Sequence, residues 1–103
     1  MDGHPCDQRL VRAFDLLGKR WNGLLLGTLR SGPAGFAELR RSLGSITDSM
    51  LSERLGELVE AGLVGRTVTD TRPPGVSYRL TAAGEAILPV LEQLACWAAD
   101  NLG

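Results

Sequence analysis

Cysteine and histidine are scarce in this sequence, which contains two cysteines and one histidine. A zinc site usually needs four such ligands at characteristic spacings, so we expect no metal centre. The catalytic groups of an enzyme are also missing as a set, because the single histidine, His4, lies near the N-terminus and no glycine-rich phosphate loop follows a strand. The composition therefore predicts neither a catalytic site nor a bound cofactor.

Long hydrophobic runs are absent too. No segment reaches the roughly 20 uninterrupted apolar residues that a membrane helix requires, and the N-terminal stretch has no apolar run that could serve as a signal peptide. We therefore expect a cytoplasmic protein that does not bind membranes. In that compartment reduced thiols are favoured over a structural disulfide.

Neither sign of charge dominates, since 11 lysines and arginines stand against 12 acidic residues and the formal net charge is −1. This balance excludes a chain that is basic throughout, but a DNA-binding protein needs only one positive face. The length of 103 residues and the 44% hydrophobic content are typical of a single globular domain, here residues 1–103.

The most informative stretch lies in the middle of the chain. Apolar residues at helical spacing predict a helix over residues 36–43, which Gly44 ends. Ser45 or Thr47 is placed to cap a second helix over residues 47–61. Two such helices joined by a short turn that contains glycine are typical of a helix-turn-helix, whose second helix enters the major groove of DNA.

A β-hairpin is predicted directly after this motif. Residues 63–80 hold two β-rich runs around a turn of threonine, proline and glycine that carries Arg72. A helix-turn-helix followed by a hairpin is a winged helix, so the expected fold is mainly α with a small β-hairpin (α+β). Residues 34–35 are expected to form a short edge strand beside the hairpin.

Three further helices are expected, over residues 7–17, 19–31 and 82–101. The buried side of the second should carry Trp21, Leu24, Leu25 and Leu29. The third follows a capping residue, Thr81, and has an apolar stripe broader than so small a domain can cover by itself. We expect a second copy of the chain to cover this stripe.

These features together resemble the HxlR family of bacterial winged-helix transcriptional regulators. The resemblance covers nearly the whole chain. After an N-terminal cysteine, it rests on motifs in the family's order and spacing: Gly18-Lys19-Arg20-Trp21, Phe36-x-Glu38-Leu39, Leu51-x-x-Arg54-Leu55-x-x-Leu58, Gly62-Leu63-Val64-x-Arg66, Pro73-Pro74-x-Val76-x-Tyr78-x-Leu80-Thr81 and Trp97. It implies a homodimer held by the terminal helices, with two recognition helices in successive major grooves. Such symmetry implies a pseudo-palindromic operator in double-stranded DNA, with half-sites about 10 bp apart or a multiple of that.

DNA contacts are expected on the second helix of the motif and on the wing. The face of that helix opposite its leucines carries the candidates for groove contacts, Thr47, Ser49, Ser52 and Glu53. Arg72 is the candidate for a phosphate or minor-groove contact, and Arg40 and Arg41 are candidates for the DNA backbone.

Three charged residues near these candidates need separate interpretation. Arg54 and Arg66 match the family pattern, but each fits equally well an ion pair with Glu57 or Glu60 that stabilises the domain. Asp48 stands at a position where the family often has lysine, so we expect it to repel phosphate.

Cys6 is a candidate sensor, because it lies just before the first helix and beside His4, where the helix dipole and the imidazole favour a reactive thiolate. The alternative is an inert thiol. Some family members use a cysteine at this place to sense oxidants or electrophiles. If the terminal helices cross in a dimer, Cys6 of one subunit approaches Cys96 of the other, and a disulfide requires α-carbons within about 7 Å. A switch by thiol oxidation or by a small effector is left open.

The competing interpretation is a winged helix that binds another protein and no specific DNA, which the near-neutral charge would suit. An affinity for DNA that falls steeply with salt distinguishes the two.

Overall fold

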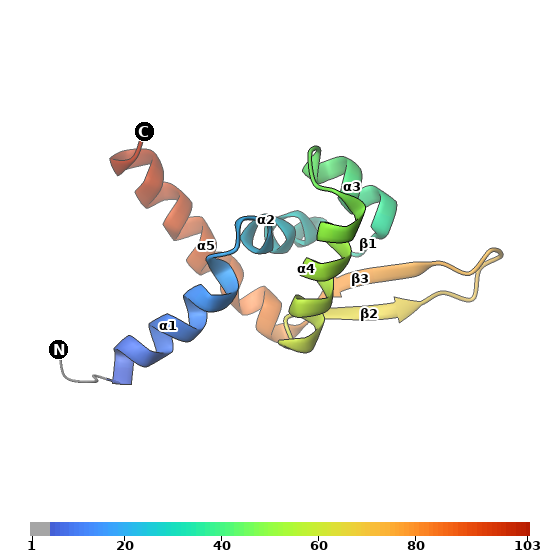
Figure 1. The fold of residues 1–103 in the computed structure, drawn as a ribbon, viewed down its shortest axis with the longest axis horizontal. Coiled ribbons are helices and arrows are strands. Elements are labelled where there is room, and N and C mark those ends of the chain that lie inside the picture. Colours follow the sequence, from blue (N-terminus) through green and yellow to red (C-terminus); the bar gives the residue numbers. More distant parts are fainter. Residues whose placement is uncertain (1–4) are drawn as a thin grey trace.

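The computed structural model describes the backbone of residues 5–103 and the side chains from residue 7 onward. Within this range the elements are α1 (Pro5–Leu17), α2 (Arg20–Thr28), the 3₁₀ turn η1 (Leu29–Ser31), β1 (Ala34–Gly35), α3 (Phe36–Leu43), α4 (Asp48–Glu60), β2 (Val64–Val68), β3 (Val76–Leu80) and α5 (Ala82–Asn101). In Figure 1 the β2–β3 hairpin projects from one side of the molecule, and α1 and α5 project from the other. The winged-helix architecture expected from the sequence is confirmed.

The small sheet is antiparallel, with strand order β1-β3-β2. Ala34 of β1 pairs with Tyr78, so the short edge strand lies against the hairpin as expected. At the far end of the hairpin, the Thr69 amide donates to the Gly75 carbonyl at 2.7 Å, and the Gly75 amide donates to Thr69 Oγ1 at 2.9 Å. These bonds close the wing tip over a turn that presents Arg72 to solvent.

The core lies between α2, α3, α4 and the start of β2. Its fully buried side chains are Leu25, Leu26, Leu29, Leu39, Ile46, Leu51, Leu55, Leu58 and Val64. Each such side chain contributes about 1.5–3 kcal/mol when it leaves water, so the three leucines of α4 hold this helix firmly on the domain. One face of α4 is thereby fixed and the opposite face is left to solvent.

The buried side of α2 differs from the expected one. Leu24 is 50% exposed, and Leu26 lies in the core in its place. The buried stripe consists of Asn22, Leu25 and Leu26 of α2 and continues with Leu29 of η1, which keeps the i, i+3, i+4, i+7 spacing of an amphipathic helix. A run of adjacent leucines fits two such stripes, and packing against α4 selects the one that includes a polar residue.

Local caps set where the helices begin and end. Thr47 Oγ1 accepts a hydrogen bond from the Met50 amide at 3.1 Å, and Thr81 Oγ1 accepts one from the Gly84 amide at 3.2 Å. Gly44 has a φ of 71° after α3, a conformation that favours glycine. α1 begins at Pro5 and therefore earlier than residue 7. Among the described helices, none combines the length and hydrophobicity needed to cross a membrane.

Candidate nucleic-acid interface

The helix-turn-helix is formed by α3 and α4. Glu38 Oε1 accepts a hydrogen bond from the Gly35 amide at 2.9 Å and so secures the first turn of α3. Ile46 in the connecting turn is buried, which pins the turn to the core. Thr47 then caps α4, whose direction is fixed by this anchor on one side and by its own buried leucines on the other.

The four residues predicted to meet the groove lie together on the exposed side of α4. Ser49, Ser52 and Glu53 are exposed, and Thr47 is exposed at the start of the helix. The hydroxyls of Thr47 and Ser49 are 3.4 Å apart. Thr47 is also the helix cap, so its oxygen already accepts one hydrogen bond from the backbone. The structure therefore presents a row of hydroxyls and one carboxylate on the face that leucines do not use.

The arginines of α3 lie beside the start of α4. Arg40 forms an ion pair with Asp48, in which both side chains are largely exposed. This ion pair offsets the negative charge of Asp48, which is expected from the sequence to repel phosphate. It also occupies Arg40, whereas Arg41 and the wing-tip residue Arg72 are exposed and form no ion pair within the described part of the chain.

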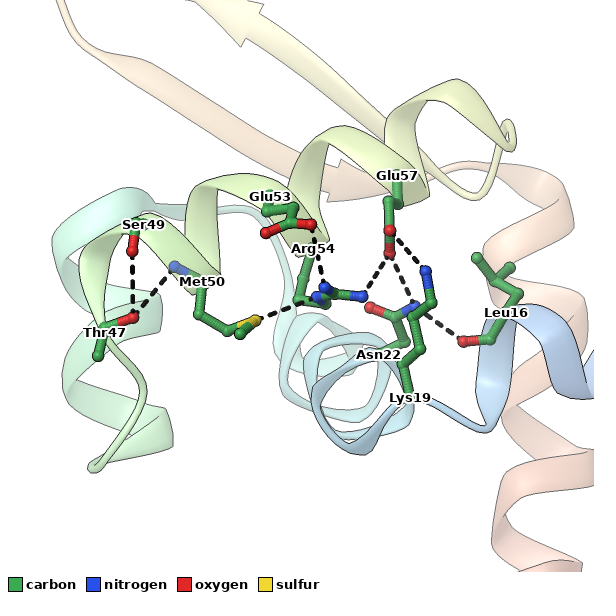
Figure 2. A network of polar contacts seen from close by, with 9 residues as sticks. All are labelled: Leu16, Lys19, Asn22, Thr47, Ser49, Met50, Glu53, Arg54 and Glu57. Carbon is green, nitrogen blue, oxygen red and sulfur yellow. Dashed lines mark hydrogen bonds and ion pairs between the residues drawn. The ribbon is translucent and has the colours of Figure 1, made fainter.

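A polar network connects α2 with the middle of α4, as Figure 2 shows. Glu57 is its centre: its carboxylate accepts hydrogen bonds from Lys19 Nζ at 2.7 Å, Arg54 Nη1 at 2.9 Å and Asn22 Nδ2 at 3.5 Å. The hydrogen bond from Lys19 lowers the pKa of Glu57, against the opposing effect of partial burial. The carboxylate therefore stays ionised and holds the three donors.

Arg54 belongs to this network and not to the exposed face of α4. Its side chain is 12% exposed, and a second carboxylate, that of Glu53, lies 3.3 Å from Nη2. Of the two alternatives left open for Arg54, the structure favours the ion pair within the domain. Glu53, a candidate for a groove contact, therefore also forms an ion pair within the domain.

Asn22 was not anticipated from the sequence. It is fully buried, and its Nδ2 donates to the carbonyl of Leu16 in the last turn of α1 at 2.8 Å. Its Oδ1 has no hydrogen-bond partner among the described groups. Asn22 thus links the last turn of α1 to Glu57 in the last turn of α4. The available signal was its position, because it continues the apolar spacing of Leu25, Leu26 and Leu29 with a polar side chain.

The terminal helices carry apolar side chains into solvent. Phe14 of α1 is 55% exposed and Trp97 of α5 is 53% exposed. Further exposed apolar residues on these helices are Leu10, Val11, Val90 and Leu94. Cys96 is also exposed on α5. The side chain of the other candidate sensor, Cys6, lies outside the described residues.

Comparison with known proteins assigns the family. A family model described as HxlR-like helix-turn-helix matches residues 16–103. The chain belongs to the HxlR family. This HxlR-family protein is 40% identical to YodB of Bacillus subtilis, an HTH-type transcriptional regulator, over 96 residues that make up 93% of this chain and 86% of YodB. The helix-turn-helix is accordingly that of a DNA-binding transcriptional regulator.

Solved structures agree with this assignment. The reduced form of YodB superimposes on this chain with a TM-score of 0.84 at 40% identity. The match covers 90% of this chain and 91% of the YodB chain. YodB has also been solved after diamide treatment and with quinone bound, each with a TM-score of 0.79 to this HxlR-family chain. The redox regulator HypR in its oxidised form has a TM-score of 0.83 at 35% identity, covering 90% and 96% of the two chains.

Proposed function

We propose that this HxlR-family regulator acts as a homodimer on a pseudo-palindromic operator in double-stranded DNA. In this proposal α4 enters the major groove with Thr47, Ser49, Ser52 and Glu53 toward the bases. Arg72 of the wing and Arg41 of α3 contact the backbone, and Arg40 joins them when its ion pair with Asp48 loosens. The observation that carries the proposal is the row of exposed hydroxyls on α4, held outward by the fully buried leucines behind it.

The dimer is supported by the apolar surface of the terminal helices. Leu10, Val11 and Phe14 of α1 and Val90, Leu94 and Trp97 of α5 are each about half exposed, on helices that project away from the domain (Figure 1). Covering these side chains on two subunits would contribute on the order of 10 kcal/mol before the cost of association. A twofold axis between the terminal helices would leave both wings and both α4 helices at the outside of the assembly.

The protein is proposed to work in the cytoplasm and to perform no catalysis, in keeping with its family of transcriptional regulators. Binding can be located by fluorescence anisotropy against duplexes that tile the DNA upstream of its own gene, at two salt concentrations. A preference for one duplex and an affinity that falls steeply with salt support a sequence-specific regulator. Equal and salt-insensitive behaviour on every duplex would favour the protein-interaction module instead.

The dimer is tested separately by sedimentation. Trp97→Glu places a charge on the apolar face of α5 and is expected to yield monomers at concentrations where the wild type is dimeric. Asp100→Glu, also on α5, keeps its charge and serves as the matched control. A wild-type protein that sediments as a monomer at all concentrations would refute the dimer.

Thiol control is proposed because the relatives include a redox regulator and a regulator solved in reduced, diamide-treated and quinone-bound forms. The candidates are Cys6 and the exposed Cys96. A thiol oxidant such as diamide, which takes up the two electrons and two protons of the thiols, is expected to join Cys6 of one subunit to Cys96 of the other and to change operator affinity. Non-reducing electrophoresis of wild type, Cys6→Ser and Cys96→Ser tests this. An oxidised wild type that remains monomeric on the gel with unmodified thiol masses would exclude it and leave a small effector as the candidate signal.

A further inference from the structure

A groove of about 520 Å³ separates the recognition helix from the wing. Its lining consists of Ser52, Gly56, Val59, Glu60, Arg66 and Tyr78. Gly56 lies in the middle of α4, and its missing side chain leaves open space, since a Cβ built there meets nothing within 4 Å. The groove is therefore open along the side of α4 that neighbours the sheet.

The positive charge in this groove comes from Arg66 of β2. Arg66 is opposite Tyr78 in the antiparallel register, so both side chains lie on the same face of the sheet as the buried Val64. Arg66 is exposed and forms no ion pair with any described residue, although Glu60 lines the same groove. The alternative of an ion pair within the domain is thus not realised for Arg66, unlike Arg54.

The position of the groove indicates what fills it. A helix in the major groove and a wing on the neighbouring minor groove stand on opposite sides of one sugar-phosphate strand. That strand must then cross the space between α4 and β2. Its phosphates are anions, and an unpaired guanidinium together with serine and tyrosine hydroxyls offers the donors that phosphate oxygens accept.

We propose that the groove between α4 and the wing is a phosphodiester site, in which Arg66 contacts one phosphate of each operator half-site. Tyr78 and Ser52 are positioned in the same groove to donate from their hydroxyls. This site rests on the proposed DNA-binding function and adds to it a contact that carries no base specificity. Arg66 therefore determines affinity and register, while the exposed hydroxyls at the start of α4 determine sequence preference.

The chain offers a matched control on the other face of the same sheet. Arg79 is also exposed, but its Nη1 donates to Thr67 Oγ1 at 2.9 Å, and its guanidinium lies over Gly65. Arg66→Ala and Arg79→Ala thus remove the same charge from the wing on opposite faces. Only the first should weaken DNA binding, by about tenfold for specific and non-specific duplexes alike, as expected for a charged hydrogen bond.

The salt dependence and a modified duplex identify the contact as a phosphate. For Arg66→Ala the slope of log affinity against log salt should be smaller by about 0.9 per lost contact, and Arg66→Lys should restore most of it. Neutral methylphosphonates are then placed one at a time along the operator. At one position per half-site, the methylphosphonate should weaken binding by the wild type but not binding by Arg66→Ala. If the methylphosphonate at every position weakened Arg66→Ala by the same factor as the wild type, the site would be overturned.

The outcomes separate this site from the function on which it rests. A wild type without salt-dependent binding to any duplex would overturn both. A wild type that binds, with Arg66→Ala equal to Arg79→Ala in affinity and salt slope, would overturn the phosphate site alone. Glu60→Gln removes a negative charge from the same groove and should strengthen binding, whereas weaker binding by this variant would contradict the proposal.

Discussion

Replacing Asn22 by alanine tests whether the network below α4 is a structural link or an incidental contact. The fully buried amide donates to the Leu16 carbonyl at 2.8 Å and approaches Glu57 at 3.5 Å. Its loss removes about 1 kcal/mol of hydrogen bonding and leaves a small cavity worth about 1–2 kcal/mol. Removing the unpartnered Oδ1 returns part of this cost. We expect a net destabilisation of about 2 kcal/mol, or a melting temperature about 10 °C lower in a domain of this size.

Thermal and urea unfolding at equal protein concentration measures the effect, because the proposed dimerisation would make the midpoint depend on concentration. Asn101→Ala is the matched control: Asn101 Nδ2 also donates to a backbone carbonyl, that of Trp97, at 2.9 Å, but on an exposed helix. It should change stability by less than about 0.5 kcal/mol. Asn22→Asp keeps the volume and adds a charge beside Glu57, so it should be worse than Asn22→Ala. Equal stability of Asn22→Ala and Asn101→Ala would show that the buried amide is an incidental contact.

Further predictions concern four single positions. Because the pKa of Glu57 is lowered from its ordinary 4.5, its carboxylate stabilises the fold above that pH, and the contribution is lost as pH falls through the lowered value. The melting temperature of Glu57→Gln should therefore fall less than that of the wild type between neutral pH and pH about 3, and parallel curves would contradict this. Gly84→Ala should destabilise the domain by more than about 2 kcal/mol, since a Cβ at this position would clash with the carbonyl oxygen of Leu63. Gly56→Ala, with free space around it, should instead be stabilising by about 0.5–1 kcal/mol, and the same sign of change at both glycines in urea unfolding would refute the packing argument. Asp48→Asn frees Arg40 from its ion pair and should raise DNA affinity and steepen its salt dependence, whereas an unchanged anisotropy titration would show that Arg40 does not reach DNA.

The parts of the fold that follow from neighbouring residues could be predicted from the sequence. Thr47 caps α4 and Thr81 caps α5 through bonds to amides three residues ahead, and Gly44 has the positive φ expected at the end of α3. Capping chemistry involves only one turn of chain, so a single sequence contains all of it. The spacing of the leucines in α4 likewise identified the face that packs.

Contacts between distant segments could not be predicted in the same way. Leu24 and Leu26 are equally apolar, and only the docking of α2 on α4 decides which is buried. The ion pairs of Arg54 with Glu57 and of Arg40 with Asp48 depend on how α2, α3 and α4 are placed in space. For Arg66 the sequence offered two roles, and only the folded structure shows that it forms no ion pair with a described residue.

The roles of the candidate interface residues remain predictions from the sequence, and the positions of these residues in the structure are compatible with those roles. Ser49, Ser52 and Glu53 share one exposed face, and Arg72 lies at the wing tip. Which bases these side chains contact depends on the sequence of the DNA duplex and on the distance between the two α4 helices of the proposed dimer. In the proposed dimer that distance would be set by the apolar surface of α1 and α5, which a single chain leaves uncovered.

In the proposed complex α4 reads the DNA sequence and the wing supplies affinity. The most direct measurement is the ratio of anisotropy-derived affinities for the operator and for a scrambled duplex, compared among wild type, Ser52→Ala and Arg72→Ala at one salt concentration. The ratio should fall by about tenfold for Ser52→Ala, and for Arg72→Ala it should stay unchanged while both affinities drop. A ratio near one for the wild type, or a ratio lost with Arg72→Ala and kept with Ser52→Ala, would contradict the account.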